Sequence, residues 1–225
     1  MTGASALRDD LGHPLAESLL SFNLLPSRWI HPTRMAALMP HGWDTQAALS
    51  ASILHRHLSA SLLHDLAPCD LVSLEDPVVP LCLVTESVFE AVALHAGLLV
   101  LAPAVRRLIA RSEVSDLALE VGAESVDFAR HAAKPLRSGD QSPALSTGRC
   151  REQALRLGHA LLSLAFDRAQ PGLAVRARLR LPADAAMARG DLPPDLADAG
   201  AALAACMGVL RYLEPEWPSS FPDHR

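Results

Sequence analysis

Hydrophobic side chains recur along most of this chain at spacings of three and four residues, which is the period of a helix with one buried face. The clearest stripe follows Asp44, a residue type that often caps the start of a helix. Its members are Ala47, Ala51, Leu54, Leu58 and Leu62. The pattern predicts a helix from about Asp44 to Leu66 with this stripe on its inner face.

A more apolar stretch follows this helix. Thr85 or Ser87 is expected to open the next helix, and Ser87 with Glu90 fits a capping box. Pro103 is expected to interrupt it and to begin a new segment, because proline lacks the N–H that a helix interior needs. This apolar run is therefore expected to be too short to span a membrane. Leu101, Val105, Leu108 and Ile109 are expected to face one way, towards the interior.

Two further helices have recognisable ends. Ser112 is expected to cap a helix that Gly122 ends, because glycine readily adopts the left-handed conformation found there. Another helix is expected from about Arg149 to Arg168.

The last helix follows Asp195 and carries no charged residue from Ala199 to Leu210. A helix without a polar face is expected to be buried all round. Gly200 and Gly208 would then allow neighbouring helices to approach closely.

Residues 173–181 fit two structures. Their apolar residues alternate with Arg176, Arg178 and Arg180, which is a strand pattern with the arginines on the solvent side. A short helix is the alternative, because no second strand is evident as a partner. The arginines are either a solvated face or a binding surface for phosphate or an acidic partner.

The predicted fold class is therefore all-α. We expect residues 1–225 to form one compact helical bundle, with at most one short strand or irregular element at 173–181. The segment 134–148 is rich in Gly, Pro and Ser and is a candidate subdomain boundary.

Composition limits the function. Half of the 225 residues are hydrophobic and 20% are charged, as in globular proteins. The net charge of −5 is opposite to the positive charge expected of a nucleic-acid-binding domain. The N-terminus shows no secretory signal, so a cytoplasmic protein is expected. The four cysteines form no C-x-x-C pair, which argues against zinc and redox sites.

Candidate chemistry is sparse. The chain has no Walker A, dinucleotide-binding or nucleophile-elbow motif, so neither a cofactor nor a small-molecule substrate is expected. His57 and His64 share a helix face but lie about 10 Å apart along the axis, too far to share one metal ion. His95, between apolar residues, is expected to be a hydrogen-bonded core histidine rather than a catalytic base.

The stretch "SFNLLPSRWIHPTRM", residues 21–35, places aromatic and apolar residues between two prolines. We expect Pro26 and Pro32 to stiffen it, so that Trp29 is held against the helix that begins at Asp44.

The same stretch, with "LMPHGWD" after it, resembles the N-terminal signature of the SctK (YscK-type) family of type III secretion proteins. The matching positions are Phe22, Pro26, Trp29, Trp43 and Asp44. "HAGLLVLAPAVRRLIARSEVSDLALEVGAESVDFAR" resembles the family's central block, and "RARLRLP", Arg176 to Pro182, is a third similarity. The three blocks stand in the family's order and cover most of the chain.

This resemblance implies a mostly helical, non-enzymatic cytosolic adaptor of the type III secretion sorting platform. Its expected partners are the pod protein of the platform, the cytoplasmic domain of the inner-membrane ring protein and, indirectly, the secretion ATPase complex. It would lie peripherally on the inner-membrane secretion apparatus.

The family offers no catalytic residues to carry over. The alternative is a small helical enzyme or metal-binding protein whose His and Arg residues meet only in the folded chain. For the adaptor, the candidate partner contacts are two groups of arginines, since Arg pairs with carboxylates and stacks on aromatic rings. They are Arg106, Arg107 and Arg111, and Arg176, Arg178 and Arg180.

Overall fold

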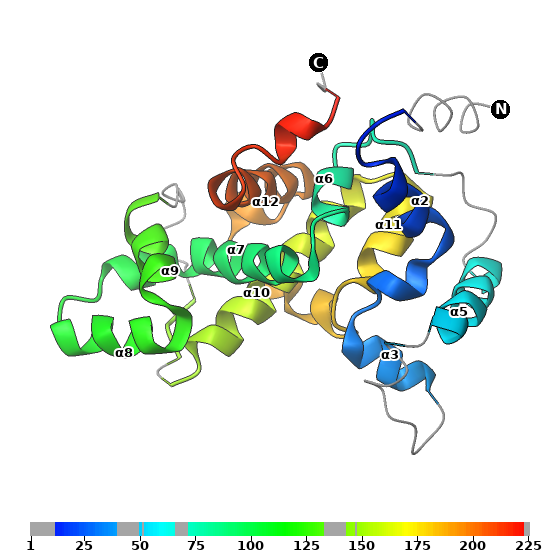
Figure 1. Cartoon of the computed structure of the whole chain (residues 1–225). Coiled ribbons are helices and arrows are strands. Elements are labelled where there is room, and N and C mark those ends of the chain that lie inside the picture. Colours follow the sequence, from blue (N-terminus) through cyan, green and yellow to red (C-terminus); the bar gives the residue numbers. More distant parts are fainter. Residues whose placement is uncertain are drawn as a thin grey trace. The chain divides into compact units, whose positions relative to one another are not determined.

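The computed structural model describes residues 12–39, 50, 52–65, 72–132, 143–146 and 148–222. The chain is all-α, and the described residues contain no strand (Figure 1). It divides into two compact units. Unit 1 comprises 1–83, 169–183 and 219–225, and unit 2 comprises 84–168 and 184–218.

Unit 1 is assembled from short helices. They are α2 (Ala16–Leu24), η1 (Pro26–Trp29), α3 (Pro32–Leu38), α5 (Ser52–Asp65), α6 (Val79–Cys82) and α11 (Pro171–Leu179). A proline opens η1, α3 and α11, where its fixed φ suits the first turn and its missing N–H costs no hydrogen bond. Proline placement in the sequence thus sets where these helices begin.

Two buried polar side chains hold the loop before α6 in unit 1. The Asn23 side chain donates from Nδ2 to the Val72 carbonyl and accepts from the Val72 N–H at Oδ1, at 3.1 and 2.8 Å. The Asp76 carboxylate accepts from the backbone N–H groups of Val78 and Gln170, at 2.9 and 3.1 Å. Asp76 therefore joins the starts of α6 and α11.

The opening segment meets α5 through η1, and the expected packing of Trp29 against that helix stays a prediction. Trp29 packs edge-on against Phe22, with ring centroids 5.6 Å apart. It is Ser27 of η1 that hydrogen-bonds to α5. The predicted start of that helix at Asp44 lies outside the described residues.

Unit 2 is built around two long helices, α7 (Glu86–Arg106) and α10 (Cys150–Ala165). They cross at two glycines. A methyl group on Gly97 would overlap the Ala154 carbonyl oxygen, and one on Gly158 would overlap the Ala93 carbonyl oxygen. These glycines let the two backbones touch, so the close-contact role expected for Gly200 and Gly208 lies here instead.

The prediction for Pro103 is wrong. The helix begins after Thr85, whose hydroxyl accepts from the Val88 N–H, and it continues past Pro103 to Arg106. Pro103 lies in the last turn, so only one hydrogen bond is lost near an end that frays anyway. At 21 residues, α7 is long and apolar enough to cross a membrane, against expectation. However, 78% of its most apolar 18-residue stretch is buried within the protein, as in a core helix.

Three short elements follow α7. Helix α8 (Arg111–Val121) begins one residue before Ser112, with Ala110 at its N-cap, so the predicted cap is displaced. Gly122 ends it with φ of 92°, as expected, a conformation that other residues rarely adopt. Helix α9 (Ala123–Asp127) then passes into a π-helical turn, η2 (Phe128–Ala132).

The C-terminal part of unit 2 is a series of short turns followed by one long helix. These are η4 (Phe166–Arg168), η5 (Ala185–Asp191), η6 (Pro194–Leu196) and α12 (Ala199–Leu213), before the final turn η7 (Pro218–Ser220). The Asp198 carboxylate caps α12 by accepting from the Ala201 N–H at 2.9 Å.

The expectation that α12 is buried all round is wrong. Its inner face is Ala202, Cys206, Val209 and Leu210, whereas Ala204, Gly208 and Tyr212 are exposed. A run without charged residues does not require a buried helix when its outer side chains are as small as alanine and glycine, since little apolar area is left in water.

The domain expectations stay predictions. Most of the candidate boundary at 134–148 lies outside the described residues, and unit 2 continues through it from Val84 to Arg168.

Candidate functional site

Arg176 and Arg178 lie on a helix, α11, and Arg180 caps its C-terminal end in a helical conformation, which settles the alternative left open by the sequence. On a helix, residues four apart share a face. Arg176 and Arg180 therefore point the same way, and they point inward, with 3% and 1% of their surface exposed. Val175, which directly precedes Arg176, is the exposed residue of this part of α11.

Arg180 is an interior cross-link of unit 1. Its Nη1 donates to the Cys82 carbonyl at 2.5 Å, and its guanidinium stacks on the Trp29 ring, 5.1 Å from the ring centroid. Arg176 donates to the Gly172 carbonyl of its own helix at 3.3 Å. A partner cannot reach these two groups, so the predicted solvent-side surface is wrong for Arg176 and Arg180. Arg178 is half-buried.

The second arginine group lies where α7 turns into α8. Arg106 is half-buried, and its Nε donates to the Arg130 carbonyl of η2 at 3.1 Å, which gives it a structural task. Arg107 and Arg111 are exposed, and neither forms an ion pair with another described residue.

Ile109 stands between these two arginines with 94% of its surface exposed. Isoleucine is among the residues most often found buried. The prediction that Ile109 faces inward with Leu108 is therefore wrong. The signal that could have found it is the end of α7, after which helical spacing no longer applies.

A serine–histidine pair lies between η1 and α5. Ser27 Oγ is 2.9 Å from His55 Nδ1 and 2.8 Å from Ser59 Oγ, and it also donates to the His55 carbonyl. This spacing would suit a nucleophile and its base. However, Ser27 has no exposed surface and His55 is 7% exposed, so the group is a hydrogen-bond junction that a substrate cannot reach.

His95 is a core histidine, as predicted. Its Nδ1 lies 2.8 Å from the Ala91 carbonyl, and its ring packs edge-on against Phe128 at 5.0 Å. Tyr212 of α12 covers the same ring pair, 4.8 Å from Phe128. Burial lowers the pKa of His95 below its usual value, although the Ala91 carbonyl and Glu124 act in the opposite direction.

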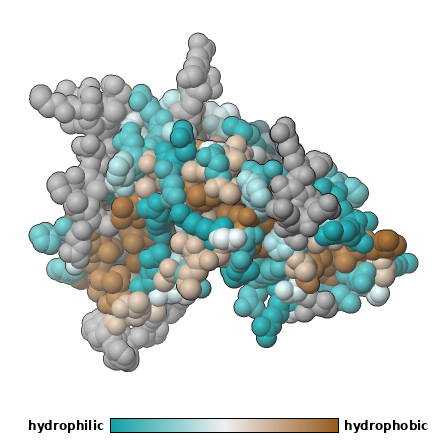
Figure 2. Space-filling model, turned by 180° about the vertical axis from the view of Figure 1, so that it is seen from behind, coloured by the Kyte–Doolittle hydropathy of each residue, from teal (hydrophilic) through white to brown (hydrophobic). Residues whose placement is uncertain are grey.

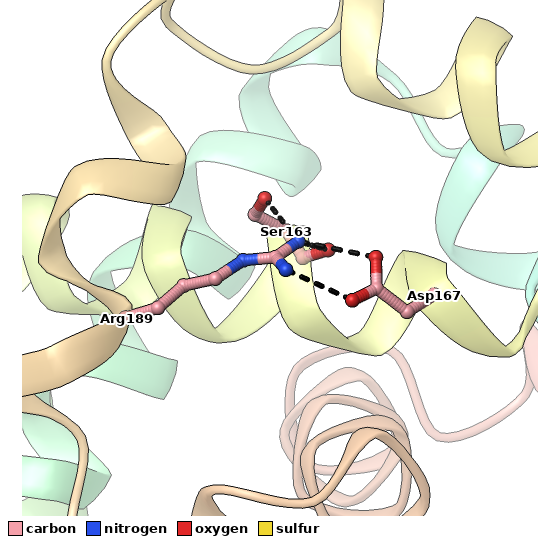
Figure 3. A network of polar contacts seen from close by, with 3 residues as sticks. All are labelled: Ser163, Asp167 and Arg189. Atoms are coloured by element: carbon pink, nitrogen blue, oxygen red, sulfur yellow. Dashed lines mark hydrogen bonds and ion pairs between the residues drawn. The ribbon is translucent and has the colours of Figure 1, made fainter.

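Figure 3 shows a further polar network within unit 2, between Arg189 of η5 and the C-terminal end of α10. The Arg189 guanidinium donates to both carboxylate oxygens of Asp167, at 2.9 and 3.1 Å, and to the carbonyl and hydroxyl of Ser163, at 2.5 and 2.8 Å. Such a bidentate pair fixes η5 against α10, a structural role.

Arg156 and Asp191 form an ion pair at 2.5 Å within an open hollow of about 650 Å³ in unit 2. The hollow is also lined by Pro143, Gln153, Pro193 and Pro194. Since the two charges neutralise each other, the hollow has no unpaired group to attract a charged ligand.

The three thiols that the structure describes are all buried. Burial raises the pKa of each: far above its usual range for Cys82, to about 11 for Cys150 and to about 12 for Cys206. Cys69 lies outside the described residues. Within the described ranges no three His, Cys, Asp or Glu residues are grouped to hold a metal ion, and His57 and His64 are both exposed on α5.

No family model matches the chain, and neither a curated protein nor a solved structure is similar to it. The resemblance to the SctK family therefore rests on the three sequence blocks alone.

Proposed function

We propose that this chain is a non-enzymatic cytosolic adaptor of a type III secretion sorting platform. It joins the pod protein to the cytoplasmic domain of the inner-membrane ring protein and so holds the secretion ATPase complex indirectly. The observation that carries the proposal is the order of the three sequence blocks, which is that of the SctK family.

The distribution of these blocks over the fold supports an adaptor. The first block contributes α2, η1 and α3 of unit 1, and the third contributes α11 of the same unit. The central block contributes α7, α8 and α9 of unit 2. A protein that joins two partners needs two separate surfaces, and each compact unit offers one of its own.

The polar interior also favours an adaptor over an enzyme. Ser27, His55 and Arg180 are the side chains whose geometry most suits chemistry, and each is bonded within unit 1 and closed to solvent. Polar groups that are hydrogen-bonded inside a protein rigidify its fold and are not placed to meet a substrate.

Affinity purification of the tagged chain from cells of its own species tests this function. Protein from wild-type cells should carry both the pod protein and the ring protein. Protein from cells that lack the pod gene should keep the ring protein, because an adaptor binds its two partners through different surfaces. Recovery of neither protein from wild-type cells contradicts the proposed function.

A further inference from the structure

One exposed corner of unit 2 combines an apolar side chain with two cations. We name Arg107, Ile109 and Arg111 the α7–α8 corner. Arg107 and Ile109 lie in the link between α7 and α8, and Arg111 is the first residue of α8. Figure 2 shows hydrophobic residues exposed at the right-hand edge, on the side where α8 lies.

The corner is locally basic in an acidic protein. The whole chain carries a net charge of −5, yet no acidic residue occurs between Glu90 and Glu113. Glu113 is two residues from Arg111 on α8, and residues two apart on a helix do not face each other. The charge of Arg111 is therefore not neutralised along its own helix.

Arg111 occupies a position where its own helix disfavours a positive charge. It is the first residue of α8, where the positive end of the helix dipole disfavours a cation. Arg107, by contrast, follows the C-terminal end of α7, where a cation is favourable. An unfavourable charge beside an almost fully exposed isoleucine is the kind of arrangement that a binding partner explains.

We propose that the α7–α8 corner binds an acidic segment of one of the two platform partners, and that this segment also presents an apolar side chain to Ile109. The inference rests on the proposed adaptor function and assigns it a surface. Carboxylates match the planar fork of each guanidinium, and the apolar contact excludes water from the ion pairs and strengthens them.

A protein fits this corner better than a membrane. Electrostatic attachment to anionic lipid takes clusters of roughly four to eight basic residues, and the corner has two exposed ones. An anionic surface also repels a chain whose net charge is −5.

The test is the affinity of the purified full-length chain for the purified pod protein and for the ring protein's cytoplasmic domain, each measured at low and at high salt. Replacement of both arginines, R107E with R111E, should weaken binding to one of the two partners about tenfold or more at low salt. The loss should shrink at high salt, where charges are screened. Ile109→Ser should weaken the same complex at both salt concentrations, because an apolar contact is not screened.

The matched control is R168E with R211E, which reverses two other exposed arginines of unit 2 and should leave both affinities within about threefold. Thermal melting should be unchanged for all variants, since the replaced side chains are exposed.

Three results would overturn the proposal. If wild type binds and the R107E/R111E variant binds with the same affinity, the α7–α8 corner is not the binding surface. The proposed adaptor function would not be contradicted by that result. Corner-dependent binding to vesicles of anionic lipid, without effect on either protein, assigns the corner to a membrane. Wild-type protein that binds neither partner contradicts the adaptor function and the corner together.

Discussion

Several buried charged and polar side chains are hydrogen-bonded to backbone groups. Arg180, Asp76 and Asn23 each meet a main-chain donor or acceptor in unit 1, and His95 does so in unit 2. A buried polar group costs free energy unless it is hydrogen-bonded, so each of these contacts should be visible in stability.

Arg180→Glu should lower the free energy of unfolding by about 3 kcal/mol or more, because it places an uncompensated negative charge inside unit 1 and removes the hydrogen bond to the Cys82 carbonyl. Arg178→Glu is the control and should change stability by about 0.5 kcal/mol, as exposed or half-exposed positions do. Denaturant unfolding monitored by circular dichroism measures both. Equal midpoints for the two variants would place Arg180 at the surface.

His95 makes stability depend on pH. Its pKa in the folded protein lies below the unfolded value of 6.5, so the unfolded chain binds more protons as pH falls through this range. The contribution of a neutral His95 is therefore complete above the unfolded pKa and is lost as pH falls from 6.5 towards the folded pKa. His95→Gln should flatten this part of the stability curve.

The check is the difference in unfolding free energy between wild type and His95→Gln, measured at several pH values across the acidic range. The difference removes the contribution of the other nine histidines, which both proteins share. A difference that does not change with pH would mean that His95 keeps its ordinary pKa.

At the scale of elements, the crossing of α7 and α10 is the tightest contact in unit 2. Gly97→Ala or Gly158→Ala should cost about 3 kcal/mol, because the added methyl group meets a backbone carbonyl that cannot move aside. Gly208→Ala is the matched control. It lies on the exposed face of α12 with open space around it, so it should stabilise the protein by about 0.5–1 kcal/mol.

Thermal melts of the three variants decide this prediction. A crossing that tolerates alanine at both Gly97 and Gly158 would show that the two backbones do not touch.

Most helices could be predicted from the sequence, because their apolar residues follow a helical period and their ends carry recognisable signals. Gly122 is the clearest example, and α10 (Cys150–Ala165) lies within the predicted range from about Arg149 to Arg168. The 173–181 segment could not be settled, since alternating arginines fit a strand as well as a helix that buries every fourth residue. Burial of Arg180 depends on Trp29 and Cys82, which are distant in sequence.

The candidate site was predictable only in part. Arg107 and Arg111 are exposed cations, as their sequence positions suggested, whereas Arg106 is occupied by the Arg130 carbonyl. The apolar member, Ile109, was misplaced because helical spacing was extended past the end of α7. Which side of a linker faces solvent depends on contacts that no local pattern records.

At the scale of the whole molecule, the proposed function is that of an adaptor, which two compact helical units suit. Its partners, according to the resemblance, are a pod protein and the cytoplasmic domain of a membrane ring protein. Such a role predicts that the chain binds each partner without the other, and that it brings together two proteins that do not associate by themselves.

The most direct measurement is the mass of complexes formed from the purified pod protein and the ring protein's cytoplasmic domain, mixed with and without this chain and followed by size-exclusion chromatography with light scattering. The proposed adaptor function predicts a three-component complex when the chain is present and separate pod and ring proteins when it is absent. A pod–ring complex that forms equally well without the chain, or a chain that elutes alone from the full mixture, would contradict it.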